Sequence, residues 1–118
     1  MKVNLNKRQK EILKNLLKLF KPGSFIYPGV LIRELNISMK DAYTLLNSLA
    51  SENLLREVYE VSCPYENRST GVVYDNALEL LNADTYLSCP TCDQIIDIKE
   101  NNIAIYKVLK RIDIIYEE

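Results

Sequence analysis

The stretch from Leu31 to Leu55 reads LIRELNISMKDAYTLLNSLASENLL, and it decides how the chain folds. Its apolar residues recur every three or four positions, which is the spacing of one buried face on an α-helix. The spacing breaks at Asn36. Ser38 then starts a new helix, because Asp41 three residues later completes an S-x-x-D capping pattern. The pattern predicts two helices joined by a tight turn. The buried face of the second helix is formed by Ala42, Leu45, Leu46, Leu49 and Ala50.

A further helix is predicted ahead of this pair. Asn6 can cap its start, with Gln9 three residues on as in a capping box, and Pro22-Gly23 ends it. Its apolar face is formed by Ile12, Leu13, Leu16, Leu17 and Phe20. Its opposite face carries a basic stripe of Lys7, Lys10, Lys14, Lys18 and Lys21. Since Pro28 suits the first turn of the next helix, the sequence predicts three helices before residue 53.

After Asn53 the period of the sequence changes. Leu55, Glu57, Tyr59 and Val61 alternate with Arg56, Val58, Glu60 and Ser62, which is typical of a strand, and a polar loop at 66–71 leads into Val72-Val73-Tyr74. This segment is predicted to be a hairpin. The residues expected to share one core are Leu13, Leu16, Leu17, Leu31, Leu35, Leu45, Leu46, Leu49 and Val58.

The two-helix segment resembles the helix-turn-helix of winged-helix regulators. The resemblance lies in Leu35-Asn36-Ile37-Ser38, Ala42-Tyr43, Leu45-Leu46, Leu49 and Glu52-Asn53-Leu54-Leu55, and it covers residues 5–75. In that family glycine often stands where Asn36 and Asn53 stand here, and asparagine is the next-best residue for a left-handed backbone. The resemblance implies an α+β fold and a binding module. The same fold serves DNA binding and protein docking, so it does not name the partner.

Composition argues against an enzyme and against a membrane protein. The chain has no histidine, so the commonest general base and the commonest metal-binding imidazole are missing. Its three glycines do not form either of the glycine-rich nucleotide-binding motifs, so no phosphate-binding loop is predicted. No run of 18 apolar residues exists, and the polar, basic start lacks the apolar stretch of a signal peptide. We therefore expect a cytoplasmic, non-catalytic protein.

The cysteines form one full and one partial C-P-x-C motif. Cys89-Pro90-Thr91-Cys92 is complete, and Cys63-Pro64-Tyr65-Glu66 has glutamate in the place of the fourth cysteine. The C-terminal segment thus resembles a zinc ribbon with one ligand substituted. The resemblance implies one structural zinc ion bound by Cys63, Cys89, Cys92 and Glu66. With this segment included, the predicted fold is a winged helix-turn-helix over residues 1–75. A small zinc-ribbon-like appendage, made of a β-hairpin and a helix, follows over residues 76–118.

Other interpretations of the cysteines stay open at this point. Asp93 or water can replace Glu66 as the fourth ligand, or the ribbon can have lost its metal and kept its shape by packing. A redox C-x-x-C is disfavoured, because a strand and not a helix is predicted after Cys92. A structural disulfide is disfavoured by the reducing cytoplasm.

Two partners compete, duplex DNA and another protein. In a DNA-binding winged helix the third helix enters the major groove, the first helix and the wing supply phosphate contacts, and outward residues read bases. The candidate DNA-binding residues are Lys14, Lys18, Lys40, Tyr43, Thr44, Asn47, Ser48 and Arg68. The alternative is a docking subunit or adaptor of a larger assembly. Its support is a set of acidic residues interleaved with Ile103, Tyr106 and Tyr116, which suits a basic protein partner: Asp93, Asp97, Glu100, Glu117 and Glu118. A homodimer is compatible with either partner.

Two smaller elements are predicted in the C-terminal half of the chain. Asp75 is predicted to cap a short helix that carries Ala77, Leu78, Leu80 and Leu81. In the tail, Ile105, Tyr106, Leu109 and Ile112 suit a helix, whereas Ile112, Ile114 and Tyr116 alternate like an edge strand. We expect a helix through about residue 111 and then a short strand.

Overall fold

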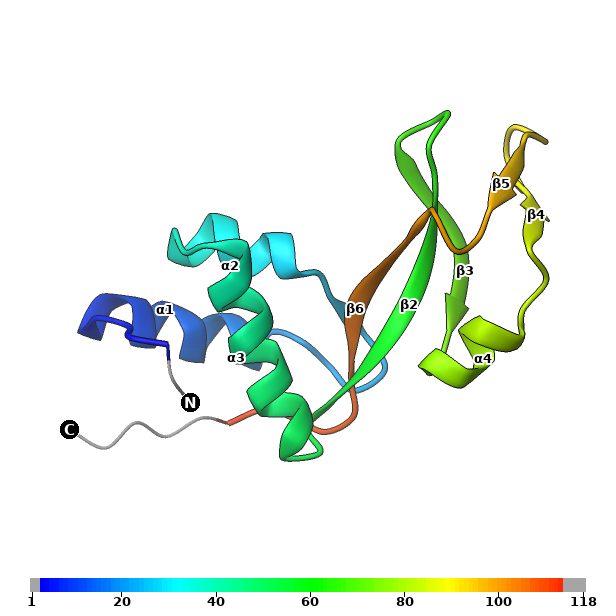
Figure 1. Ribbon diagram of the computed structural model, residues 1–118. Coiled ribbons are helices and arrows are strands. Elements are labelled where there is room, and N and C mark those ends of the chain that lie inside the picture. Colours follow the sequence, from blue (N-terminus) through cyan, green and yellow to red (C-terminus); the bar gives the residue numbers. More distant parts are fainter. Residues whose placement is uncertain (1–2, 114–118) are drawn as a thin grey trace. The chain divides into compact units, whose positions relative to one another are not determined.

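The computed structural model describes residues 3–113, and within them the chain has a mixed α+β fold (Figure 1). The elements, in chain order, are α1 (Lys7–Lys18), β1 (Phe25–Ile26), α2 (Pro28–Leu35), α3 (Met39–Ser51), β2 (Leu55–Cys63), β3 (Arg68–Tyr74), α4 (Ala77–Asn82), β4 (Tyr86–Ser88), β5 (Ile95–Asp97) and β6 (Asn102–Val108). The chain forms two compact units. Unit 1 comprises residues 1–56 and 106–118, and unit 2 comprises residues 57–105.

The capping predicted for α1 and α3 is confirmed, and Pro28 lies in the first turn of α2 as predicted. Asn6 caps α1 in a capping box, because its Oδ1 accepts from the Gln9 N–H at 2.8 Å and its own N–H donates to Gln9 Oε1 at 2.9 Å. Ser38 Oγ accepts from the Asp41 N–H at 3.1 Å at the start of α3. Asn36, with φ of 53°, is the left-handed residue that ends α2, so the turn between α2 and α3 forms where the apolar spacing broke.

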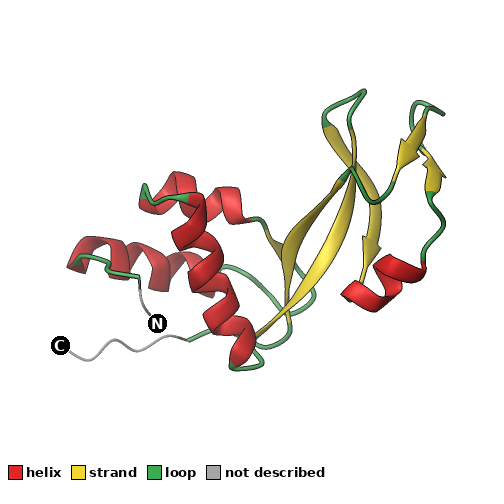
Figure 2. Cartoon of the chain, in the orientation of Figure 1, coloured by secondary structure: helices red, strands yellow, loops and turns green. Residues whose placement is uncertain are grey.

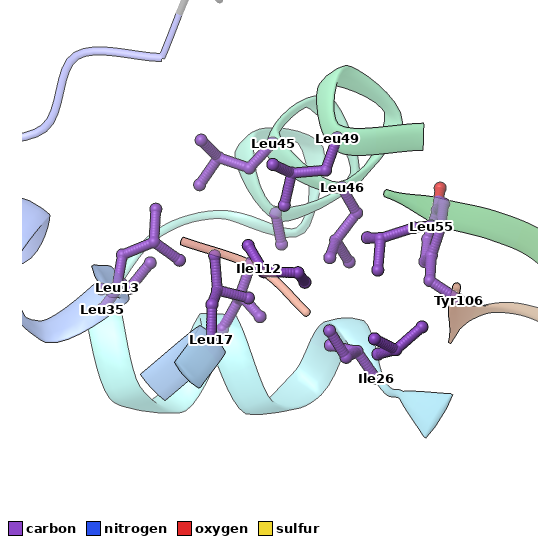
Figure 3. Close-up of a cluster of buried hydrophobic side chains, with 13 residues drawn as sticks. Leu13, Leu17, Ile26, Leu35, Leu45, Leu46, Leu49, Leu55, Tyr106 and Ile112 are labelled. Carbon is purple, nitrogen blue, oxygen red and sulfur yellow. The ribbon is translucent and has the colours of Figure 1, made fainter. Parts of the chain in front are cut away.

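Unit 1 has a single apolar core, drawn in Figure 3. Leu13 and Leu17 from α1, Leu35 from α2, and Leu45, Leu46 and Leu49 from α3 point toward one another in this view. Tyr106 and Ile112 join them from the end of the chain. The predicted core is confirmed for the helical leucines, with Leu16 half-buried against it. Val58 is buried too, but it belongs to unit 2 and lies outside this cluster.

Strands β1, β6, β2 and β3 form an antiparallel sheet in that order (Figure 2). In unit 1, Ile26 of β1 lies opposite Tyr106 of β6. In unit 2, β2 pairs with β3, so the predicted hairpin is confirmed, with Cys63 opposite Arg68. The pairing shifts register between Glu60 and Ser62, just before the cysteine.

Unit 2 builds a second, smaller core. Its fully buried members are Val61, Cys63, Cys89, Ile96 and Ile98, so two of the five are cysteines. The hairpin of β4 and β5 forms a separate two-stranded sheet, in which Leu87 lies opposite Ile96. The short helix α4 contributes only the half-buried Leu80, whereas Leu78 and Leu81 are 67% and 64% exposed.

Two predictions about the C-terminal third are wrong. Residues 102–108 form the strand β6 and not a helix. Ile105 and Tyr106 are buried in succession in β6, so the alternation of buried and exposed residues that identifies a strand with one exposed face is hidden. The edge strand expected at 112–116 falls largely outside the described residues. The second error concerns α4, which is capped by Asn76 and not by Asp75, since Asn76 Oδ1 accepts from the Glu79 N–H at 2.8 Å.

The compact units divide the chain differently from the predicted boundary after residue 75. That boundary stays a prediction about independent folding, which compactness alone does not test. Within residues 3–113, no helix combines the length and the apolar character needed to cross a bilayer.

Candidate metal centre

Two turns of unit 2 bring together the predicted metal ligands. The first joins β2 to β3 and the second joins β4 to β5, and both lie at the same end of unit 2 (Figure 1). The donor atoms of four residues all lie within 4.8 Å of one another, in a group that we call the ligand cluster. The ligand cluster consists of Cys63, Glu66, Cys89 and Cys92. The clustering predicted from the complete and the partial C-P-x-C motif is confirmed.

The two turns are built alike. Each begins with a buried cysteine that ends or follows a strand, and each continues with a proline. Each closes on a left-handed residue four positions after the first cysteine, Asn67 with φ of 53° and Asp93 with φ of 61°. The second turn is held by the Cys89 N–H donating to the Gln94 carbonyl at 2.8 Å and by the Asp93 N–H donating to the Cys89 carbonyl at 3.0 Å. Glu66 therefore occupies the turn position that Cys92 occupies in the other turn.

The distances within the ligand cluster suit a tetrahedral ion. All three cysteines are free thiols, and the Sγ atoms of Cys63 and Cys92 lie 3.7 Å apart. Two sulfurs at about 2.3 Å from one tetrahedral zinc ion would be about 3.8 Å apart. Cys89 Sγ lies 3.6 Å from Oε1 of Glu66, close to the roughly 3.6 Å expected between a sulfur and an oxygen on the same ion. These four residues could hold a metal ion.

Hydrogen bonds lower the pKa of the Cys89 thiol to about 7. The nearby Thr91 hydroxyl, whose oxygen lies 3.4 Å from the sulfur, contributes most, followed by the backbone N–H of Thr91, and these outweigh the opposing effect of burial. The backbone N–H of Cys92 also donates to this sulfur. Cys89 thus stands in an environment that stabilises the thiolate, which is the form that binds metals.

The pKa of Cys92 moves the other way, to about 12. The backbone N–H of Gln94 lowers it, but burial and the neighbouring sulfurs of Cys89 and Cys63 raise it by more. Three thiols this close resist carrying several negative charges at once, because like charges repel. A cation between them would remove that repulsion, so the cluster ionises most readily with a metal bound.

Glu66 is exposed, yet its carboxylate is held in place. The Thr91 hydroxyl donates to Oε1 of Glu66 and contributes most to a lowered pKa of this carboxyl. Burial opposes this shift, while the Cys89 thiol and the positive charge of Arg68 favour it. The alternative fourth ligand, Asp93, is exposed and is not a member of the ligand cluster.

Thr91 was missed by sequence reasoning. It lies between the two cysteines of the complete motif, and threonine is not a common zinc ligand. Its partner Glu66 is 25 residues away, so no local pattern reports the contact. The only available signal was the match between the C-P-x-C motif and the C-P-x-E motif, which predicts that the turns meet.

The candidate DNA-binding residues are divided between the units. Lys14, Lys18, Lys40, Tyr43, Thr44, Asn47 and Ser48 belong to unit 1, and Arg68 belongs to unit 2. Lys18, Lys40 and Asn47 are exposed, and Lys14 is half-buried. Lys18 lies 3.8 Å from the Asp113 carboxylate. Arg68 starts β3 beside the ligand cluster, where its charge acts on Glu66.

The outward face of α3 is partly engaged within its own unit. Oδ1 of Asn47 accepts a hydrogen bond of 2.5 Å from the hydroxyl of the buried Tyr106, and the ring of Tyr43 packs 6.2 Å from the ring of Tyr106. The Thr44 hydroxyl donates to the Lys40 carbonyl at 2.8 Å, one turn back in the helix. These contacts restrict what Asn47 and Thr44 can offer to a base.

No protein family, characterised protein or solved structure matches this chain.

Proposed function

We propose that the ligand cluster holds one structural zinc ion, which ties the β2–β3 turn to the β4–β5 turn. The observation that carries this proposal is the likeness of the two turns. Each places two donors at the same spacing, with a proline between them and a left-handed residue after them. Two such turns facing each other supply four ligands, which is the number that structural zinc sites use.

The choice of zinc follows from the ligands. Three thiolates are soft donors and disfavour calcium and magnesium, which prefer oxygen. Glu66 adds a carboxylate oxygen, and a tetrahedral set of sulfur and oxygen donors suits zinc. Since four protein side chains complete the shell, the site leaves no position open for a substrate, and its role is structural.

Unit 2 has a physical need for such an ion. The buried cluster around its two turns holds five residues, two of which are the cysteines themselves. Small units that cannot bury enough apolar surface are commonly stabilised by a metal or by disulfides. The free energy of zinc binding would then contribute directly to the folding of residues 57–105.

Removal of the metal tests this role. Treatment of the zinc-loaded protein with a strong chelator should increase amide hydrogen exchange in residues 57–105 and leave α1, α2 and α3 protected. A Cys63→Ser variant, purified in parallel, should show the same increase of amide hydrogen exchange in unit 2 without chelator. Unchanged exchange in unit 2 of metal-stripped protein would contradict a structural role for the ion.

We further propose that unit 1 is a winged helix-turn-helix that binds duplex DNA. Its support is the charge of the two units. Unit 1 has thirteen basic and seven acidic residues, whereas unit 2 has two basic and nine acidic residues. The net charges are therefore +6 and −7. Phosphate neutralisation supplies much of the affinity for DNA, so unit 1 suits a duplex and unit 2 repels one.

Local features of unit 1 fit this proposal. The left-handed Asn36 separates α2 from the capped α3, as a helix-turn-helix requires. A hollow of about 430 Å³ after the end of α1 is lined by Lys18, Lys21 and Arg111, among others, which gathers three cations at one place. In this proposal Lys40 and Ser48 of α3 face the groove. Asn47 contributes its amide NH₂ group, because its carbonyl oxygen already accepts from Tyr106.

Binding to duplex DNA at several salt concentrations tests this second proposal. We expect sub-micromolar affinity at low salt and a linear fall of log K with log salt concentration, with a slope that counts the phosphates contacted. Because unit 2 is acidic, we expect that Arg68 alone does not bind unit 2 to DNA. If no duplex binds below micromolar concentration at low salt, DNA binding is ruled out.

The runner-up function is protein docking, and the exposed apolar residues of unit 2 favour it. Leu78, Leu81, Tyr86 and Ile95 are each more than 60% exposed, in a unit with a net charge of −7. Such a surface suits a basic, amphipathic partner. A partner that binds the intact chain at moderate salt, and fails to bind a Leu78→Asp, Leu81→Asp variant, would give this function first place.

A further inference from the structure

The Thr91 hydroxyl lies at the point where the two metal-binding turns meet. It donates a hydrogen bond to Oε1 of Glu66, and its oxygen lies 3.4 Å from Cys89 Sγ. Thr91 thus contacts one candidate metal-ligand atom from each turn, Oε1 of Glu66 and Sγ of Cys89, although it is not itself a member of the ligand cluster.

Glu66 needs an external restraint more than the cysteines do. The sulfurs of Cys89 and Cys92 are oriented by backbone N–H groups of their own turn, and Cys63 is buried at the end of β2. The Glu66 side chain is two bonds longer than that of cysteine, and it is exposed. A long exposed side chain samples several rotamers, and most of them carry its carboxylate away from the cluster.

Among the groups that hydrogen-bond to Glu66, only the Thr91 hydroxyl can keep its hydrogen bond when a metal is bound. The Thr91 hydroxyl and the Cys89 thiol donate to Oε1 of Glu66, and the Cys92 thiol also hydrogen-bonds to this carboxylate. A metal-bound cysteine is a thiolate, which has no proton to donate. The hydrogen bonds from Cys89 and Cys92 are therefore lost on metal binding, whereas the hydrogen bond from Thr91 can persist. An ionised carboxylate has about four lone-pair positions, so one oxygen can accept from Thr91 while the group also binds the ion.

We propose that Thr91 is a positioning residue that orients Glu66 as the fourth ligand of the metal. This inference rests on the proposed metal site and adds a residue that acts through Glu66. Because the hydroxyl holds the carboxylate beside the three sulfurs before the ion arrives, metal binding does not have to order an exposed side chain. Partners of this kind, one shell beyond the ligands, commonly change metal affinity by about 10- to 100-fold.

The test compares Thr91→Val with Thr91→Ser in the full chain. Zinc affinity is measured by competition with a chromophoric chelator, and cobalt is used as a spectroscopic probe. Thr91→Val keeps the shape and removes the donor, so we expect at least about a tenfold loss of zinc affinity. The ligand-field bands of bound cobalt should shift as water replaces the carboxylate, while the thiolate charge-transfer bands remain. Thr91→Ser restores the hydroxyl and should restore both readouts.

The same substitution in a Glu66→Ala background separates positioning from folding. If Thr91 acts through Glu66, Thr91→Val should cause no further loss of affinity once Glu66 is absent. An equal loss in both backgrounds would show a merely structural role and overturn the inference. Thr85→Val, which removes another exposed threonine of unit 2, serves as the matched control and should leave the affinity unchanged.

The outcomes for the inference and for the metal site are distinct. If the unsubstituted protein binds neither zinc nor cobalt, the proposed metal site fails and the role of Thr91 fails with it. If it binds zinc through the three sulfurs and Thr91→Val binds equally well, the metal site stands and only the positioning role is overturned.

Discussion

At the scale of single residues, Glu66 is the position that sets the character of the candidate metal centre. It stands where the other turn has Cys92, and both positions precede a left-handed residue. A carboxylate at this position is a harder and more exposed ligand than a thiolate, so it holds zinc less tightly than a fourth cysteine would.

Glu66→Cys should therefore raise zinc affinity, and Glu66→Ala should lower it, each by about tenfold or more. The matched turns predict that the new thiol meets the other three without a change of backbone. Competition with a chelator of known affinity measures both effects, and cobalt bound to Glu66→Cys should show stronger thiolate charge-transfer absorption. Lower affinity in Glu66→Cys than in the unsubstituted chain would contradict the equivalence of the two turns.

Tyr106 gives a second prediction at this scale. Its buried hydroxyl donates to Asn47, so Tyr106→Phe should destabilise unit 1 by about 1 kcal/mol, the usual net contribution of one hydrogen bond. The effect is modest because the exposed Asn47 can turn to water. Urea unfolding measures the difference, with the exposed Tyr86 changed to Phe as the control. A loss above about 3 kcal/mol would show that the hydroxyl supports more than this one contact.

At the scale of elements, the features that could be predicted are those set by residues close together in the sequence. The caps of α1 and α3 rest on side chains three residues from their acceptors, and the sequence alone identifies them. β6 could not be predicted in this way, because its place between β1 and β2 is a property of the whole sheet. The ligand cluster was predictable from its repeated motif, whereas the contact between Thr91 and Glu66 was not.

The packing of α3 yields the prediction for this scale. Leu46 is fully buried among residues from α1, α2 and the end of the chain, so Leu46→Ala should cost about 2–5 kcal/mol of unfolding free energy. Thermal or urea unfolding followed by circular dichroism provides the measurement. Met39, which is on the same helix but 63% exposed, supplies the control as Met39→Ala. A cost below 1 kcal/mol for Leu46→Ala would remove α3 from the core.

At the scale of the whole molecule, the segregation of charge is the main feature. A basic unit and an acidic unit in one chain of net charge −1 are expected to face different partners. β3, α4, β4 and β5 all lie in the segment between β2 and β6, so most of the acidic unit 2, with three of the four residues of the ligand cluster, is encoded as one continuous segment between these two strands.

The proposed DNA contacts predict how charge removal changes salt dependence. Replacing Lys14 and Lys18 by glutamine should weaken binding to all duplex sequences alike and reduce the salt slope by about one per lysine. Lys99→Gln removes an exposed charge of unit 2 and should leave the slope unchanged. Binding curves across a series of salt concentrations supply the slopes. An equal effect of Lys99→Gln would show that the lysines act only through net charge.

The central claim is that the four residues of the ligand cluster hold a zinc ion. X-ray absorption at the zinc edge, combined with metal analysis of protein purified without chelator, tests it most directly. The proposed site predicts about one zinc per chain, with three sulfur ligands near 2.3 Å and one oxygen ligand near 2.0–2.2 Å. Protein that contains no zinc, and acquires none when zinc is supplied to the reduced chain, would contradict the claim.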